Sequence, residues 1–149
     1  MEVSGSISEI LSGKSSNVWS ISPEATVLDA IKLMSEKNVG ALVVLEAQKL
    51  VGIISERDYT RKVILKGRSS RETPVRDVMS GELIITNPND LVMECMRLMS
   101  EHHVRHLPVM DGDRLVGVIS TGDLVHWIIS AQTAAIDQLQ KYITGEYPA

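Results

Sequence analysis

Leu50-Val51-Gly52-Ile53-Ile54-Ser55-Glu56-Arg57-Asp58 has a second copy in the same chain, Leu115-Val116-Gly117-Val118-Ile119-Ser120-Thr121-Gly122-Asp123, in which every position lies 65 residues further on. Each copy is a short apolar run followed by a Ser and, three residues later, by an Asp in a helical pattern. This order predicts a strand that leads into a helix N-terminus, where backbone N–H groups and the helix dipole can hold an anion. The duplication therefore predicts two related ligand sites.

The duplication extends well beyond this motif. Without a gap, the same offset pairs Pro23 with Pro88 and pairs the run Leu33-Met34-Ser35-Glu36 with Leu98-Met99-Ser100-Glu101. A single half of about 60 residues buries too little surface to be robust alone. We therefore expect an α/β (α+β) fold in which two pseudo-symmetric β-α-β-β-α repeats pack through their sheets and leave two equivalent clefts.

The first half predicts a strand at 18–21 and a helix that Thr26 caps, with its apolar positions at Val27, Ala30, Ile31 and Met34. Asn38 and Gly40 end this helix. Apolar strands follow at 41–45 and 50–54, with a turn at Ala47-Gln48 between them. Ser55 then opens a helix that ends at Gly67.

The second half repeats this order. It predicts a strand at 83–85, a helix with Asp90 as its cap, and strands at 107–110 and 115–119 around the turn Asp111-Gly112-Asp113. Ser120 opens a last helix that runs to Tyr142. We divide the chain into an N-terminal arm (1–17), a first repeat (18–66), a linker (67–82), a second repeat (83–130) and a C-terminal helix extension and tail (131–149), of which 145–149 is irregular.

Composition places the chain among soluble globular proteins. Its 149 residues are 44% hydrophobic and 23% charged, and its net charge of −4 gives no reason to expect nucleic-acid binding. No apolar run approaches the roughly 18–20 residues that span a bilayer, and no signal peptide is visible. Cys95 is the only cysteine, which excludes an internal disulfide and fits a reducing compartment. We expect a cytoplasmic protein without membrane contact.

The duplicated unit, with Gly-x-x-Ser-x-x-Asp after its last strand, resembles the cystathionine-β-synthase-type (CBS) domain, and two such units in tandem resemble a Bateman module. The resemblance covers roughly residues 8–130 and extends to the stand-alone CBS-pair proteins. It implies a regulatory module that binds AMP, ADP, ATP, an NAD-type dinucleotide or S-adenosylmethionine between the repeats and that dimerises into a flat disc. The implied partners are the adenosyl ligand, a second copy of the chain and an unidentified regulated protein. No catalytic cofactor is implied.

The same resemblance assigns the candidate ligand residues. Asp58 and Asp123 would accept hydrogen bonds from ribose hydroxyls, as an acid does in dinucleotide folds. The residues expected near phosphate are Ser55, Arg57, Arg105, Ser120 and Thr121. The segments that open the second strand of each repeat, Gly40-Ala41-Leu42 and Arg105-His106-Leu107, would line the adenine and phosphate regions, with adenine on apolar strand ends around Leu42 and Leu107.

Each assignment has a structural alternative. Ser and Asp three residues apart also form a capping box, and both roles can coexist. Three His at 102, 103 and 106 invite a metal site, but they do not share a helical face. Ser12-Gly13-Lys14-Ser15 resembles the end of a phosphate-binding loop, but Ser8 stands where its first glycine belongs and no strand precedes it.

The segment from Arg57 to Arg76 carries a local charge of +5, which is typical of a solvated face and can also attract phosphates.

Two other classes of function compete with the regulatory one. A structural, partner-binding module would use the last helix, with Trp127, Ile128, Ile136 and Leu139. No arrangement of Ser, His, Asp or Cys supports catalysis, so we expect no enzyme.

Overall fold

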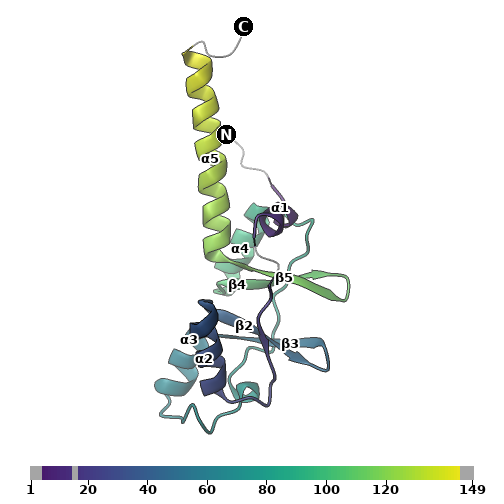
Figure 1. The fold of residues 1–149 in the computed structure, drawn as a ribbon, viewed down its shortest axis with the longest axis vertical. Coiled ribbons are helices and arrows are strands. Elements are labelled where there is room, and N and C mark those ends of the chain that lie inside the picture. The colour runs from purple at the N-terminus through teal and green to yellow at the C-terminus, as the bar shows by residue number, and fades with distance from the viewer. Residues whose placement is uncertain (1–4, 15–16, 145–149) are drawn as a thin grey trace.

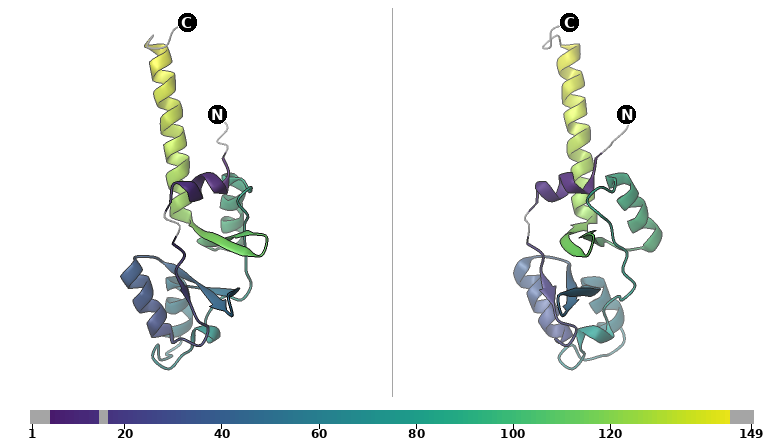
Figure 2. Two further views of the ribbon diagram at one scale, coloured as in Figure 1. Left: turned by 45° about the vertical axis from the view of Figure 1, so that its right-hand side comes forward. Right: turned by 90° about the vertical axis from the view of Figure 1, so that its right-hand side faces the viewer.

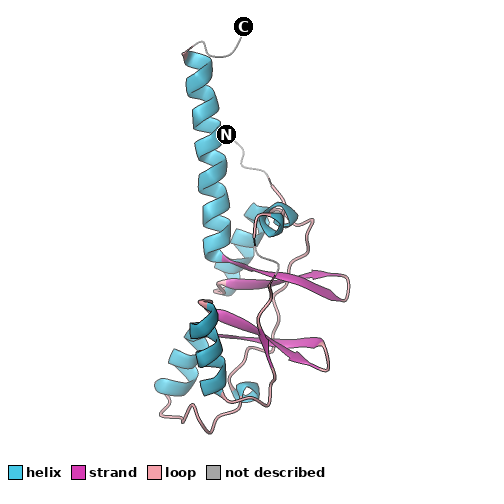
Figure 3. Cartoon of the chain, viewed as in Figure 1, coloured by secondary structure: helices cyan, strands magenta, loops and turns pink. Residues whose placement is uncertain are grey.

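The computed structural model describes residues 5–14 and 17–144. Two sheets face each other in the middle of the molecule and the helices cover their outer sides (Figures 1 and 3). Each repeat has its own buried apolar cluster. The predicted α+β fold of two pseudo-symmetric repeats is confirmed, whereas the predicted tail at 145–149 lies outside the described residues.

The first repeat is built on a three-stranded sheet. β1 (Ser20–Ile21) runs parallel to β2 (Ala41–Glu46), and β2 pairs antiparallel with β3 (Lys49–Ser55). α2 (Val27–Lys37) begins after Thr26, whose side chain accepts a hydrogen bond from the backbone N–H of Asp29, so the predicted cap is confirmed. Ala47 and Gln48 form the hairpin turn with φ of 51° and 67°, values that suit the tight turns joining twisted strands.

The helix predicted from Ser55 to Gly67 has an irregular interior. α3 (Glu56–Asp58) continues as the π-helix η1 (Tyr59–Ile64), and Gly67 follows with φ of 67°. The helical segment is confirmed, but its wider π turn leaves no trace in the spacing of apolar residues. The turn places Val63 fully inside the first core.

The second repeat copies this plan. α4 (Val92–His102) is followed by β4 (His106–Asp111), β5 (Arg114–Ser120) and the 23-residue α5 (Thr121–Ile143). The two hairpins even share an irregularity, since the register shifts after Val44 in one and after Val109, 65 residues later, in the other. The duplication therefore holds at the level of strand register.

The strand predicted at 83–85 is wrong. In the first repeat the Val43 N–H donates to the carbonyl of Trp19 at 3.3 Å, which pairs β2 with the chain before it. Pro108 occupies the equivalent position in β4 and has no N–H to donate. Pairing is reduced to an isolated bridge between Thr86 and Val109.

The cap predicted at Asp90 is also wrong. The N-cap of α4 is Leu91, which has no side-chain acceptor. Asp90 instead closes the turn before the helix, because its Oδ2 accepts from the Thr86 hydroxyl at 2.6 Å and from the Asn87 N–H at 3.0 Å. The N–H of Val92 has no acceptor within the helix and donates to the carbonyl of Gly5 at 2.9 Å. A segment far away in sequence therefore supplies the hydrogen-bond acceptor for the first turn of α4.

The arm and the linker each pack into one of the two cores. α1 (Ile7–Ser12) places Ile7 and Ile10 in the core of the second repeat. The linker contains the 3-10 helix η2 (Val75–Asp77) and places Val75 and Val78 in the core of the first repeat. The proposed domain boundaries remain predictions, and the packing shows that both connecting segments carry core residues.

α5 projects away from both repeats, as Figure 2 shows from two sides. Leu124 near its start is fully buried, whereas Ile136, Leu139 and Ile143 towards its end are more than half exposed. The predicted end of this helix, Tyr142, lies one residue from the observed one. Among the described residues, no helix combines the length and apolar character needed to cross a membrane.

Candidate functional site: two composite clefts

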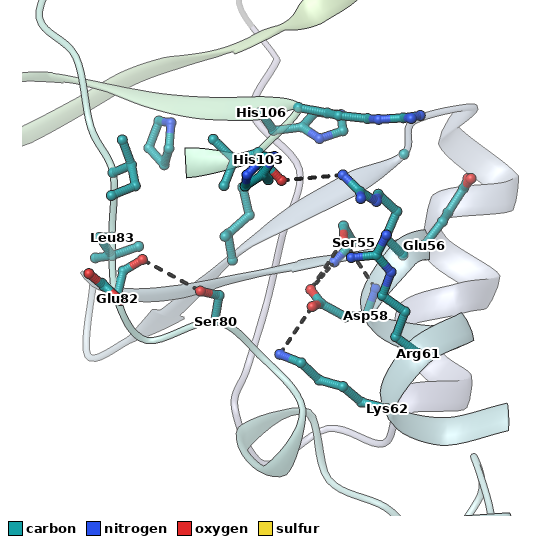
Figure 4. Close-up of a pocket in the computed structure, with 17 residues that line it drawn as sticks. Ser55, Glu56, Asp58, Arg61, Lys62, Ser80, Glu82, Leu83, His103 and His106 are labelled. Atoms are coloured by element: carbon teal, nitrogen blue, oxygen red, sulfur yellow. Dashed lines mark hydrogen bonds and ion pairs between the residues drawn. The ribbon is translucent and has the colours of Figure 1, made fainter. Parts of the chain in front are cut away.

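Two clefts lie between the repeats, and each combines the Ser–Asp helix start of one repeat with a segment of the other. The first cleft, with a cavity volume of 280 Å³, is lined by residues 55–58 of the first repeat and 103–106 of the second (Figure 4). The second cleft, with a volume of 450 Å³, is lined by Ser120 and Asp123 of the second repeat and by residues 37–41 of the first. Both volumes are in or near the range of small-ligand sites.

Both Ser–Asp pairs form complete capping boxes. In the first cleft the backbone N–H of Ser55 donates to Asp58 Oδ2 at 2.9 Å, and the backbone N–H of Asp58 donates to Ser55 Oγ at 3.3 Å. In the second cleft the equivalent distances between Ser120 and Asp123 are 2.9 Å and 3.1 Å. The capping interpretation is confirmed, and it fixes both carboxylates at the mouth of a helix N-terminus.

Each carboxylate also has a lysine partner, but the two lysines come from different places. Lys62 Nζ lies 3.2 Å from Asp58 Oδ1, one helical turn along the same segment. Lys14 Nζ lies 2.6 Å from Asp123 Oδ2 and reaches it from the end of α1. Burial by itself would raise the pKa of Asp123, but Lys14 and the hydrogen bonds from Ser120 hold that pKa below its ordinary value.

The first cleft is rich in cationic side chains. Arg57, Arg61, Lys62 and Arg105 all line it, together with His103 and His106. Its acids are Glu56, Asp58 and Glu82. Arg57 is held across the cleft, since its Nη1 donates to the carbonyl of His103 at 3.3 Å. The excess of cations suits an anionic ligand.

Gly40 and His106 line both clefts. Burial lowers the pKa of His106, and the charges of Lys14 and Arg105 lower it further against an opposing effect of Asp123. The position between the clefts therefore favours the neutral form of the imidazole. A neutral ring can accept as well as donate a hydrogen bond.

The structure shows where several of the predicted residues lie. Arg105 lies in the cleft of Asp58 and not in that of Asp123, because each cleft takes its strand-start segment from the opposite repeat; correspondingly, Ala41 lines the second cleft. The side chains of Leu42 and Leu107 are buried in the two cores, so the adenine contact expected around these strand ends stays a prediction that would have to use their backbone groups. Thr121 lines neither cleft, and its hydroxyl lies against Met99 Sδ at 3.3 Å.

Other cleft residues have no counterpart in the sequence predictions. Trp19, Lys37 and Lys14 line the second cleft, while Ser80 and Glu82 line the first. Lys37 lies over the Trp19 ring at 4.4 Å. Only Lys14 belonged to a recognisable motif, the incomplete phosphate-loop pattern, and that motif does not predict its contact with Asp123. Within the described residues no group of His, Cys, Asp and Glu could hold a metal ion.

Comparison with known proteins agrees with this geometry. The family model of the CBS domain matches the chain twice, over residues 7–64 and 75–130. The chain belongs to the CBS-domain family. The resemblance to a tandem CBS pair is confirmed, and the first match includes α1 while the second begins at η2.

Relatives and solved structures support the same assignment. The chain is 41% identical to the CBS domain-containing protein CBSX3, mitochondrial, of Arabidopsis thaliana, over 99% of this chain and 78% of that protein. A structure of a protein with CBS domains from Burkholderia ambifaria is 43% identical, with a TM-score of 0.83 over 85% of this chain and 95% of that one. The CBS domain pair of protein MJ0100, in complex with 5′-methylthioadenosine and S-adenosyl-L-methionine, has a TM-score of 0.75 over 85% of this chain and 97% of that one, and at 21% identity it shows the fold alone.

Proposed function

We propose that this CBS pair is a regulatory module that binds an adenosyl ligand in its clefts and transmits their occupancy to a partner. The observation that carries the proposal is the pair of equivalent capping-box carboxylates, Asp58 and Asp123, each facing a segment of the opposite repeat. A carboxylate in this position can accept two hydrogen bonds from a ribose diol.

The composite walls supply the means of transmission. A ligand that contacts Asp58 and Arg105 at once bridges the two repeats, because Asp58 ends α3 of the first repeat and Arg105 directly precedes β4 of the second. Such a ligand binds one arrangement of the repeats better than another and shifts the equilibrium towards it. The complex of the distantly related MJ0100 pair with 5′-methylthioadenosine and S-adenosyl-L-methionine supports the adenosyl class, and AMP, ADP, ATP and NAD(H) belong to it as well.

The test is thermal unfolding of the full chain against each of these ligands in turn. A ligand at 100 times its dissociation constant adds roughly 2.7 kcal/mol of stability and raises the unfolding midpoint by roughly 5–10 °C. The double variant Asp58→Ala/Asp123→Ala should lose this shift. Asp113→Ala, in the exposed β4–β5 turn, is the control that should keep it. A wild-type midpoint that no adenosyl ligand moves would rule the proposal out.

We propose that the module catalyses no reaction and works in the cytoplasm. Turnover of an adenine nucleotide by the purified wild-type chain, lost in the Asp58→Ala or Asp123→Ala variant, would contradict the first statement. Because one relative is named as mitochondrial, a fluorescent fusion of the full-length protein should be compared with a matrix marker. Co-localisation with that marker would contradict the second.

A specific observation also favours self-association through α5. A stripe of exposed side chains repeats along this helix with heptad spacing: Ile129, Ile136 and Ile143 occupy the a positions, and Val125, Gln132 and Leu139 occupy the d positions. β-branched residues at a and Leu at d favour two-stranded coiled coils, and this helix has Ile at each of these a positions and Leu at one d position, Leu139. We propose that a second copy of the chain packs against this stripe and forms a homodimer.

The charges of α5 suit an identical partner. The charged residues of the helix are Asp123, Asp137 and Lys141, and all of them lie off the stripe. The flanking e and g positions along the exposed part, Thr133, Ala135, Gln140 and Tyr142, carry no charge, so a second copy meets no like-charge repulsion. Light scattering after size exclusion should give a dimer for the wild type and a monomer for Ile136→Ser/Leu139→Ser. Ala134→Ser/Gln138→Ser, off the stripe, should remain dimeric. A monomeric wild type, or a dimer that survives Ile136→Ser/Leu139→Ser, would refute the proposal.

A further inference from the structure

The second cleft contains a cation that the duplication does not explain. In the first repeat, Lys62 pairs with Asp58 from four residues along the same segment. The equivalent of Lys62 at the 65-residue offset is Trp127, which packs against the second core and lies next to Gly5. The helix of the second repeat therefore offers Asp123 no lysine one turn along, where Lys62 lies in the first repeat.

Lys14 fills this position from the other end of the chain. It follows the C-cap of α1, 109 residues before Asp123, and its own equivalent at the offset is Met79. Its Nζ donates to Asp123 Oδ2 at 2.6 Å and to the carbonyl of Val118 at 2.8 Å. Its side chain is 33% exposed and that of Asp123 is 25% exposed, so the pair lies inside the cleft mouth rather than in free solvent.

The backbone that carries Lys14 is anchored to the second repeat by α1. α1 is held in the second core by Ile7 and Ile10, and Leu11 lies directly over Gly117 of β5. The lysine is therefore delivered to the cleft by a packed helix and can swing on its own side chain without unfolding α1. A ribose diol at Asp123 would compete with the Lys14 ammonium for Oδ2.

We propose that Lys14 makes the second cleft selective for adenosyl ligands that carry a phosphate on the ribose, and this role rests on the proposed function of the clefts. A neutral adenosyl ligand must displace Lys14 from Asp123 and gives the ammonium nothing in return. A phosphorylated ligand displaces it too, but offers an anion within reach of the same flexible side chain. The Lys14–Asp123 pair thus weakens the binding of every ligand at Asp123. Only an anionic ligand regains affinity, through a new contact with Lys14.

AMP and adenosine test the proposal because they differ only by the phosphate. In an Asp58→Ala background, which leaves the second cleft intact, calorimetric titration should show tighter binding of AMP than of adenosine. Adding Lys14→Met should reduce the ratio of the two affinities roughly 3- to 10-fold, with adenosine binding unchanged or tighter. Lys49→Met, at the exposed start of β3, removes one charge elsewhere and should leave the ratio as it was.

The outcomes separate the two proposals. Measurable binding to Asp58→Ala with a ratio that Lys14→Met does not change overturns the role of Lys14 and leaves the proposed function standing. Binding to neither the wild type nor Asp58→Ala overturns both. A double-mutant cycle on unfolding of the ligand-free chain, with Lys14→Met and Asp123→Asn, needs no ligand: strictly additive effects would mean that the ion pair is absent in solution and would also overturn the role.

Discussion

A Cβ atom placed on Gly40 would lie 3.5 Å from Cε1 of His106, so the strand starts of the two repeats meet between the two clefts. These residues are near-equivalents in the duplication, since Ala41 corresponds to His106 and Gly40 to Arg105. The His106 ring therefore lies within ordinary van der Waals distance of the Gly40 position. Gly40 and His106 line both clefts, so this shared wall connects the two sites directly.

The burial of His106 predicts a pH dependence of stability. Its pKa is lowered in the folded state, chiefly by burial and then by Lys14 and Arg105, against the opposing charge of Asp123. The neutral ring is favoured on folding, so this contribution is fully present above the unfolded pKa of about 6.5 and is lost as the pH falls towards the folded value. The loss is at most about 1.4 kcal/mol per pH unit.

Chemical denaturation at pH 7.5 and pH 5.5 measures this effect. The wild type should lose more stability between the two pH values than His106→Gln, in which the titrating ring is missing. Every other side chain is the same in both proteins, so the difference between the two losses isolates the effect of His106. Equal losses for the two proteins would contradict the prediction.

The repeated glycine of the duplicated motif predicts unequal effects in its two copies. A Cβ at Gly52 would lie 2.7 Å from Met79 Sδ and 2.9 Å from the backbone oxygen of Ser80, so the linker itself would have to move. A Cβ at Gly117 would lie 2.6 Å from the end of the flexible Leu11 side chain. We expect Gly52→Ala to cost about 1–3 kcal/mol and Gly117→Ala less than half as much.

Urea unfolding of both variants provides the comparison. Gly81→Ala is the control, because nothing lies within 4 Å of a Cβ at that position, and it should change the stability by no more than about 0.5 kcal/mol. Equal costs at Gly52 and Gly117 would show that close approach of the linker backbone is not what this glycine permits.

Much of this fold could be predicted because the sequence repeats the same pattern at one fixed offset. An apolar strand pair, a Ser and an Asp at one fixed offset are local patterns, and local patterns predicted β2 to β5, both capping boxes and the cleft carboxylates. Contacts between segments distant in sequence could not be predicted in the same way. Nothing near Lys14 indicates Asp123, and nothing near Arg105 shows that it faces Asp58, because each depends on how the repeats and α1 pack.

The two wrong element predictions have a similar cause. Pro108 removes a hydrogen-bond donor whose acceptor lies more than 20 residues away in the chain, so the strand pattern at 83–85 looks intact in isolation. Asp90 is a good cap by residue type, but Thr86 and Asn87 already hold its carboxylate. A single sequence shows which residues are able to take a role and not which of several roles the packing selects.

The turn that holds Asp90 predicts that loss of the Thr86 hydroxyl alone lowers the stability of the fold. Thr86 is 3% exposed, and its hydroxyl donates to Asp90 Oδ2 at 2.6 Å. Thr86→Val keeps the shape of the side chain but leaves a partly buried carboxylate without this donor. We expect a cost of about 1–3 kcal/mol in the free energy of unfolding. The control is Thr60→Val, whose hydroxyl donates at the surface to the carbonyl of Glu56 and should cost little; similar costs at the two sites would refute this account.

The capping boxes predict that the two serines contribute to stability even without a ligand. Ser55 and Ser120 each accept the backbone N–H of the Asp three residues later, and loss of such a cap costs about 0.5–2 kcal/mol. The caps belong to different repeats and share no hydrogen-bond partner, so the effects of Ser55→Ala and Ser120→Ala should add in the double variant. Replacement of each Ser by Thr or Asn, which can also cap, should recover most of the loss. Denaturation of the ligand-free proteins tests this directly, and Ser→Ala variants as stable as the wild type would mean that the serines act only on a bound ligand.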